Sequence, residues 1–179
     1  MPKLLARVAD PFLVMYGSFT VMDVDGLSFS PAALAPEELY ELVSEGDPWF
    51  AATENMAIVC SREGYHHRAE VALELWDGEP PADAEGQAET AAELLRSSSG
   101  RVRATNSMGN SGSVLDLGEP AAVWSVRVRR IRKGSQVAVY YSSSEEAADE
   151  EDEEDGGYPE GLEEFRVQFW PAARGDSPR

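Results

Sequence analysis

The sequence predicts a mainly β protein, an antiparallel β-sandwich with one or two short helices and a disordered acidic loop. At least seven short segments are rich in β-forming residues, turn-forming residues separate them, and one segment alone has a clear helical period. A chain of 179 residues can bury one sizeable core. We therefore expect a single domain over residues 1–171, with residues 142–160 as the acidic loop within it and residues 172–179 as a flexible tail.

The strands expected in the first half are uneven in length. Residues 12–24 are rich in β-forming side chains, and Gly17-Ser18 shifts their alternation, which favours a bulge or bend within one long strand. Residues 49–60 and 69–75 predict two further strands. Because a glycine turn separates these two, we expect them to form a hairpin in which Cys60 and Leu73 flank the turn.

One helix is predicted with a clear pattern, over residues 36–43. Leu39, Leu42 and Val43 are expected on its buried face, and its glutamates favour the positive N-terminal end. Residues 87–95 predict one or two further helical turns, although their apolar side chains are mostly alanines.

Five short strands are expected in the second half of the chain, over residues 101–105, 113–117, 124–129, 137–141 and 165–169. In the third of these, Trp124, Val126 and Val128 are predicted to point into the core. The alternation breaks at Arg130-Ile131, where we expect the strand to end.

The charge of the chain restricts its partners. A formal net charge of -18 argues against general binding to nucleic acids or to anionic membranes, and favours a basic protein partner. Cys60 is the only cysteine, and no segment resembles a signal peptide or a membrane span. We therefore expect a cytoplasmic protein; the sequence leaves its oligomeric state open.

Catalytic chemistry has few candidates in this sequence. Cys60, Glu63, His66 and His67 form the one cluster of residue types that bind metals, but adjacent histidines on a strand point to opposite faces. Cys60 follows three apolar residues, which is typical of a buried thiol. We therefore expect no enzyme, no metal site and no cofactor, and keep as an alternative a metal-dependent enzyme or small-ligand binder that uses His66 and His67.

Two charged groups are the candidate partner-binding residues. Eight of the fifteen basic residues lie between Arg96 and Lys133, and four of them would form one cationic face if their strands were neighbours. The second group belongs to a run of nine acidic residues between Glu145 and Asp155, whose carboxylates could mimic the phosphates of a nucleic acid. Either group could instead be a solvated surface. The candidates are Arg101, Arg103, Arg127, Arg129, Glu150, Glu151, Asp152, Glu153, Glu154 and Asp155.

Several segments resemble one known family. Residues 16–23, Tyr-Gly-Ser-Phe-Thr-Val-Met-Asp, resemble the opening strand of the competence protein J family. Residues 100–103, 113–117 and 123–128, with a Gly-Glu-Pro turn before the last of them, are similar in order and spacing to the later half of that family. The resemblance covers roughly residues 10–132. It implies a small β-sandwich that binds and inhibits a DNA-entry nuclease without catalysis of its own.

The chain departs from that family in its length, in residues 87–95 and in the acidic loop. These departures leave the partner open. Our interpretation is a non-catalytic binding protein, an inhibitor or immunity-type partner of another protein, with a nuclease as the candidate target. A structural or regulatory component of a bacterial complex is a further alternative.

Overall fold

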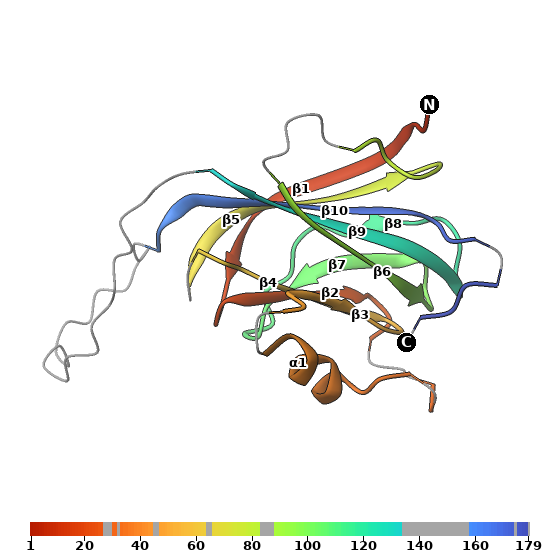
Figure 1. Ribbon diagram of the computed structural model, residues 1–179, viewed down its shortest axis with the longest axis horizontal. Helices are drawn as coiled ribbons and strands as arrows, with labels where there is room; N and C mark the ends of the chain where they lie inside the picture. The colour runs from red at the N-terminus through yellow and green to blue at the C-terminus, as the bar shows by residue number, and fades with distance from the viewer. Residues whose placement is uncertain are drawn as a thin grey trace, which may run out of the picture.

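In the residues that it describes, the computed structural model has ten strands in two five-stranded sheets, with one helix outside them (Figure 1). It describes residues 1–26, 30–31, 33–44, 47–63, 66–82, 88–133, 158–173 and 175–178. The first sheet has the order β1 (Leu4–Val14), β5 (His67–Trp76), β10 (Glu160–Pro171), β9 (Ala122–Arg132) and β6 (Ala88–Ser97). The second has the order β3 (Phe50–Ala52), β4 (Met56–Cys60), β2 (Ser18–Asp23), β7 (Arg101–Thr105) and β8 (Leu115–Asp116).

The mainly β sandwich expected from the sequence is confirmed. Neighbouring strands are antiparallel except β5 and β10, which pair in parallel from Glu164 opposite Glu70 to Phe169 opposite Leu75. The sheets are open, with β1 and β6 at the edges of the first and β3 and β8 at the edges of the second. In the described part of the chain no helix has the length and apolar character needed to cross a bilayer.

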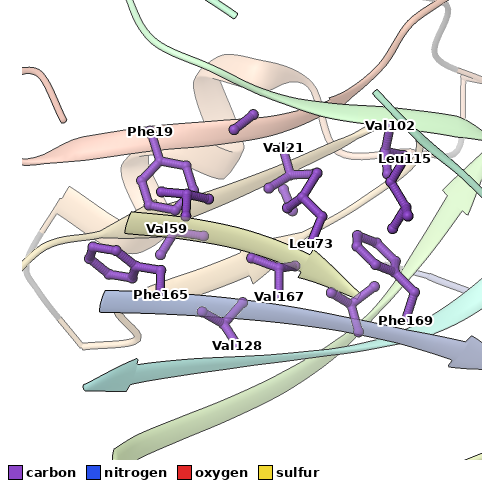
Figure 2. Packing of buried hydrophobic residues seen from close by; sticks show 14 of the residues in the cluster. Phe19, Val21, Val59, Leu73, Val102, Leu115, Val128, Phe165, Val167 and Phe169 are labelled. Atoms are coloured by element: carbon purple, nitrogen blue, oxygen red, sulfur yellow. The ribbon is translucent and has the colours of Figure 1, made fainter. Parts of the chain in front are cut away.

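The core lies between the two sheets (Figure 2). Alternate residues of β10 point into it, and Phe165, Val167 and Phe169 are completely buried. The ring of Phe165 meets the ring of Phe19 from the second sheet edge to face, at 5.1 Å between centroids. Each such phenylalanine stabilises the fold by about 1.5–3 kcal/mol through burial. The predicted inward side of Trp124, Val126 and Val128 is confirmed.

The single long strand predicted over residues 12–24 is wrong, because two strands of different sheets occupy it. They meet at a tight turn in which Met15 and Ser18 exchange backbone hydrogen bonds of 3.1 and 3.3 Å. The two central residues, Tyr16 and Gly17, have φ angles of 53° and 71°. The shift in alternation at Gly17-Ser18 therefore marks the crossing from the first sheet to the second rather than a bulge.

Residues 87–95 were predicted as helical turns, and this is also wrong. Residues 88–97 form β6, which pairs with β9 from Ala88 opposite Ile131 to Ser97 opposite Ala122. Alanine and glutamate prefer helices, but this preference is weak and the ladder along β9 overrides it.

The hairpin predicted between residues 49–60 and 69–75 is absent from the described strand pairs. β4 pairs with β2 and β3 in the second sheet, whereas β5 lies between β1 and β10 in the first. β4 and β5 follow each other in the chain, and they therefore lie in different sheets.

The helix predicted over residues 36–43 is confirmed as α1 (Pro36–Ser44), which covers the outer side of the second sheet. Leu39 and Val43, one turn apart, are buried against Ala51, Met56 and Ile58. Leu42 does not share their face and is 38 % exposed, so its predicted burial is wrong.

Two further expectations concern the second half of the chain. The alternation of β9 does not break at Arg130-Ile131: Arg130 keeps the inward side of Val128 and is itself buried. The predicted strand over residues 137–141 lies outside the described residues. The flexible tail over 172–179 stays a prediction.

Candidate partner-binding surface

The arginines of β9 that point away from the core are not a free cationic surface. Arg127 donates to the carbonyl oxygen of Pro80 at 2.6 Å and to the side chain of Gln168 at 3.1 Å, and Arg129 donates to the carbonyl oxygen of Pro81. Both arginines are less than a tenth exposed. Since a buried guanidinium needs acceptors for its donors, these two hold the loop after β5 against the outer face of the first sheet.

The single cationic face expected from four arginines does not form. Arg101 and Arg103 lie in β7 of the second sheet, whereas Arg127 and Arg129 lie in β9 of the first. Arg101 is exposed and lies 3.7 Å from the carboxylate of Asp25. The two strands could not be assigned to separate sheets from their alternation, which is the same in both.

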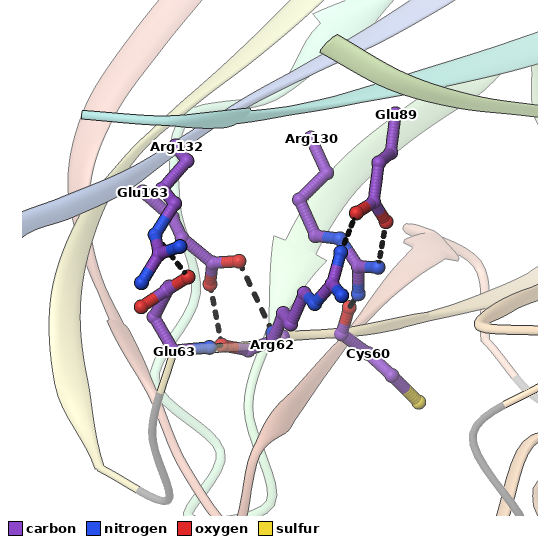
Figure 3. Close-up of polar contacts among 8 residues, drawn as sticks. Cys60, Arg62, Glu63, Glu89, Arg130, Arg132 and Glu163 are labelled. Atoms are coloured by element: carbon purple, nitrogen blue, oxygen red, sulfur yellow. Dashed lines mark hydrogen bonds and ion pairs between the residues drawn. The ribbon is translucent and has the colours of Figure 1, made fainter. Parts of the chain in front are cut away.

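Arg130 anchors a polar cluster at one end of the sandwich (Figure 3). Its guanidinium donates to the carbonyl oxygen of Cys60 at 2.9 Å, pairs with Glu89, and lies 4.3 Å from the ring centre of Trp49. The hydrogen bond from Arg130 lowers the pKa of Glu89 below its ordinary value, against the opposing effect of burial. Arg62 pairs with the same carboxylate. These charges hold β4, β6 and β9 together.

A second cluster surrounds Glu163, which is 2 % exposed. Its carboxylate accepts hydrogen bonds from the hydroxyl of Ser61 and from the backbone amide of Arg62 at 3.1 Å, and lies 3.3 Å from Nε2 of His67. Burial alone would raise the pKa of Glu163, but the bonds from His67, Ser61 and Arg62 lower it below its ordinary value. The hydroxyl of Ser61 donates to the carboxylate of Glu163, which is also the group that His67 approaches.

The two adjacent histidines have different surroundings. His67 is completely buried beside Glu163, while the ring of His66 lies edge-on to Tyr16 at 4.9 Å and to Tyr158 at 5.9 Å. Within the residues that the structure describes, no three His, Cys, Asp or Glu side chains are gathered to hold a metal ion.

An open groove of about 480 Å³ lies beside α1 and was not anticipated from the sequence. It is lined by the turn of residues 16–18, by Tyr40, Glu41, Val43 and Ser44 of α1, and by Cys60 and Ser61. Tyr16 is 53 % exposed and Tyr40 is 42 % exposed. Burial raises the pKa of the Cys60 thiol, against a smaller opposite effect of Arg130, so the groove holds a neutral thiol at pH 7.

Only part of the predicted binding set is therefore open to a partner in the described residues. Arg101 and Arg103 are exposed and half-buried, respectively, and Arg127 and Arg129 are buried. The acidic candidates from Glu150 to Asp155 lie outside the described residues, and their role stays a prediction.

The protein is an open sandwich of two sheets. Several of its arginines make hydrogen bonds within the protein, and two tyrosines flank a surface groove. This fold is similar to that of ComJ, the inhibitor of the DNA degrading activity of NucA, from Bacillus subtilis, with a TM-score of 0.53 and 12 % identity over 96 % of this chain and 99 % of ComJ. The structural similarity to the family that the sequence resembles is thereby confirmed.

A second solved structure, of the protein of crocagin biosynthetic gene J, gives a TM-score of 0.48 and 16 % identity over 93 % of this chain and 99 % of that protein. No protein-family model and no curated protein sequence matches the chain.

Proposed function

We propose that this protein is a non-catalytic inhibitor that acts by binding another protein, with a DNA-degrading nuclease as the target class. The observation that carries the proposal is the likeness to ComJ, which extends over nearly the whole of both chains. The buried clusters agree with a role without catalysis, because the hydrogen bonds of Arg130 and Glu163 are made with other groups of the same protein. We propose that the protein works in the cytoplasm, without a cofactor and without direct contact to nucleic acid or membrane.

The proposed partner is basic. The chain carries 33 acidic and 15 basic residues, so its surface attracts cations and repels polyanions. Arg127, Arg129 and Arg130 are buried among acceptors, so these cations are not exposed to a polyanion. In this proposal the acidic residues from Glu150 to Asp155 mimic the phosphates that the nuclease would otherwise bind. Arg101 and Arg103 are available as secondary contacts.

The proposal is tested by capture and reconstitution. The tagged full-length protein is used to capture partners from a native extract of its source cells, and the captured protein is purified and recombined with it in isothermal titration calorimetry. We expect a basic protein, a 1:1 complex and an affinity that falls steeply as salt rises. Binding that is indifferent to salt would contradict the electrostatic part. NucA is a first nuclease to test. If neither NucA nor any captured protein binds in the calorimetric titration, the proposal is wrong.

A further inference from the structure

We propose that the groove between the Tyr16 turn and α1 is the docking surface for a basic segment of the partner. An arginine or lysine side chain of that segment would lie against the rings of Tyr16 and Tyr40 and pair with the carboxylate of Glu41. The existence of a partner rests on the proposed function, whereas the chemistry of the groove rests on the described residues that line it.

The backbone at Tyr16 is the first observation. Tyr16 and Gly17 both have positive φ angles, at the centre of a two-residue turn between Met15 and Ser18. Asparagine, aspartate or glycine is preferred at the first of these positions, because a residue with a larger side chain is strained there. A tyrosine that is 53 % exposed recovers little of this cost through burial. A strained backbone at an exposed aromatic residue is one mark of a functional position.

The orientation of the Tyr16 ring is the second observation. The ring of His66 meets it edge to face, with 4.9 Å between centroids and 85° between planes. This contact braces one side of an exposed ring on a tight turn. A braced aromatic side chain loses little conformational entropy when a partner binds, which is a property of the tyrosines that dominate protein interfaces.

Helix α1 supplies the other wall of the groove and a negative charge. Tyr40 and Glu41 face the groove, and α1 contains three glutamates and no basic residue. Glu37 lies one turn before Glu41 and so on the same side of the helix. An aromatic ring beside a carboxylate attracts a guanidinium or an ammonium group and repels an anion.

Two arginines close to this groove offset the charge of the three helix glutamates only in part, because they share one carboxylate. Arg130 reaches the carbonyl oxygen of Cys60, and Arg62 follows Ser61, but both guanidinium groups pair with Glu89. Arg130 already makes the proposed kind of contact inside the fold, at 4.3 Å from the ring centre of Trp49. Charge complementarity therefore selects a basic occupant for the groove.

The test uses the full-length protein with 13C-labelled tyrosine rings, and the resonances of Tyr16 and Tyr40 are assigned with the variants Tyr16→Asn and Tyr40→Ala. A tri-arginine peptide is added, with tri-glutamate as the control peptide. We expect saturable shifts of both resonances with tri-arginine and none with tri-glutamate. If neither resonance shifts with tri-arginine, the groove does not have the proposed chemistry and the proposal is overturned, whether or not a partner exists.

The second arm uses the protein captured as the partner. We expect Tyr16→Asn and Tyr40→Ala each to weaken its binding about tenfold, as loss of a central aromatic contact does. Leu42→Ala, an exposed change on another side of α1, should alter it less than about twofold. Tyr16→Asn should keep or raise the melting temperature, because asparagine adopts positive φ more readily. If both tyrosine variants bind with full affinity, the groove is not the docking surface, and the proposed function is left intact.

Discussion

Replacing Glu163 with glutamine tests whether a buried charge organises the end of the sandwich. Glutamine has nearly the same size, so the packing should survive. Its carbonyl oxygen can accept from the amide of Arg62, and its NH2 group can donate to Ser61 or His67, which occupy these positions in the structure. The substitution therefore removes the charge and keeps the bond from Arg62, while the hydroxyl of Ser61 changes from donor to acceptor.

The expected loss of stability follows from the hydrogen bonds whose acceptor is no longer charged. A hydrogen bond to a charged group contributes about 1.5–3 kcal/mol and a neutral one about 0.5–1.5 kcal/mol, so each loses about 1 kcal/mol. With the bonds from Ser61 and Arg62 affected, we expect Glu163→Gln to lower the free energy of unfolding by about 2 kcal/mol at pH 7. For a chain of this length, that is a fall of about 4–8 °C in melting temperature.

The same carboxylate has a definite pH dependence. Its pKa in the folded protein is lowered from the ordinary value of 4.5. Its contribution is therefore complete above the ordinary pKa and is lost as the pH falls through 4.5 to the lowered value. The difference between the wild type and Glu163→Gln should be largest near pH 7 and should shrink in acid.

The assay is thermal unfolding followed by circular dichroism from pH 7 to about pH 3. Glu160→Gln is the matched control, because the side chain of Glu160 is 73 % exposed and lies 3.7 Å from Arg68. This control should change stability by less than about 0.5 kcal/mol. If Glu163→Gln matches the wild type in stability and in its acid dependence, the carboxylate does not act as an ionised acceptor and the reasoning fails.

Three other substitutions or deletions have expected outcomes. Arg130→Met should lower the urea-derived free energy of unfolding by about 2 kcal/mol, because the carbonyl oxygen of Cys60 loses this donor and Glu89 loses one of its two arginine partners. Arg132→Met, at a side chain that is two-thirds exposed, should lower it by less than about 0.5 kcal/mol. Gly100→Ala should lower the free energy of unfolding by about 2 kcal/mol, since a Cβ there would meet a backbone carbonyl at 2.8 Å. Gly109→Ala, also at positive φ but in open space, should lower it by about 1 kcal/mol. Deleting residues 145–155 should leave the melting temperature unchanged and weaken binding to the captured partner about tenfold at low salt, measured by calorimetry.

The sequence predicts the strands in which apolar residues alternate, because that pattern is local. The strand over residues 165–169 and the inward side of Trp124, Val126 and Val128 are such cases. β6 cannot be predicted from such a pattern. Half of its ten residues are alanine or glutamate. It is a strand because it pairs along β9, and this information lies outside the segment itself.

The assignment of strands to sheets could not be predicted for a related reason. β1 and β2, and likewise β4 and β5, are consecutive strands in different sheets, yet a turn within one sheet would use the same residue types as the sequence has between them. The arginines show the consequence: Arg127 and Arg101 alternate alike in sequence, but one is buried under a loop and the other is exposed.

The groove combines three segments that are distant in the sequence, so no local pattern encodes it. One signal was available: a tyrosine precedes Gly17 where a tight turn favours asparagine. Pro80-Pro81 is a similar signal for the buried arginines, since two consecutive prolines provide carbonyl acceptors and no backbone N–H donor.

The central claim, inhibition by binding, is tested most directly by titrating this protein into an assay of DNA degradation by its captured partner. The account expects the activity to fall in proportion to added protein, to reach its minimum at one equivalent, and to return when salt dissociates the complex. Undiminished DNA degradation at an excess of this protein, in a buffer where calorimetry shows the complex to be saturated, would contradict it.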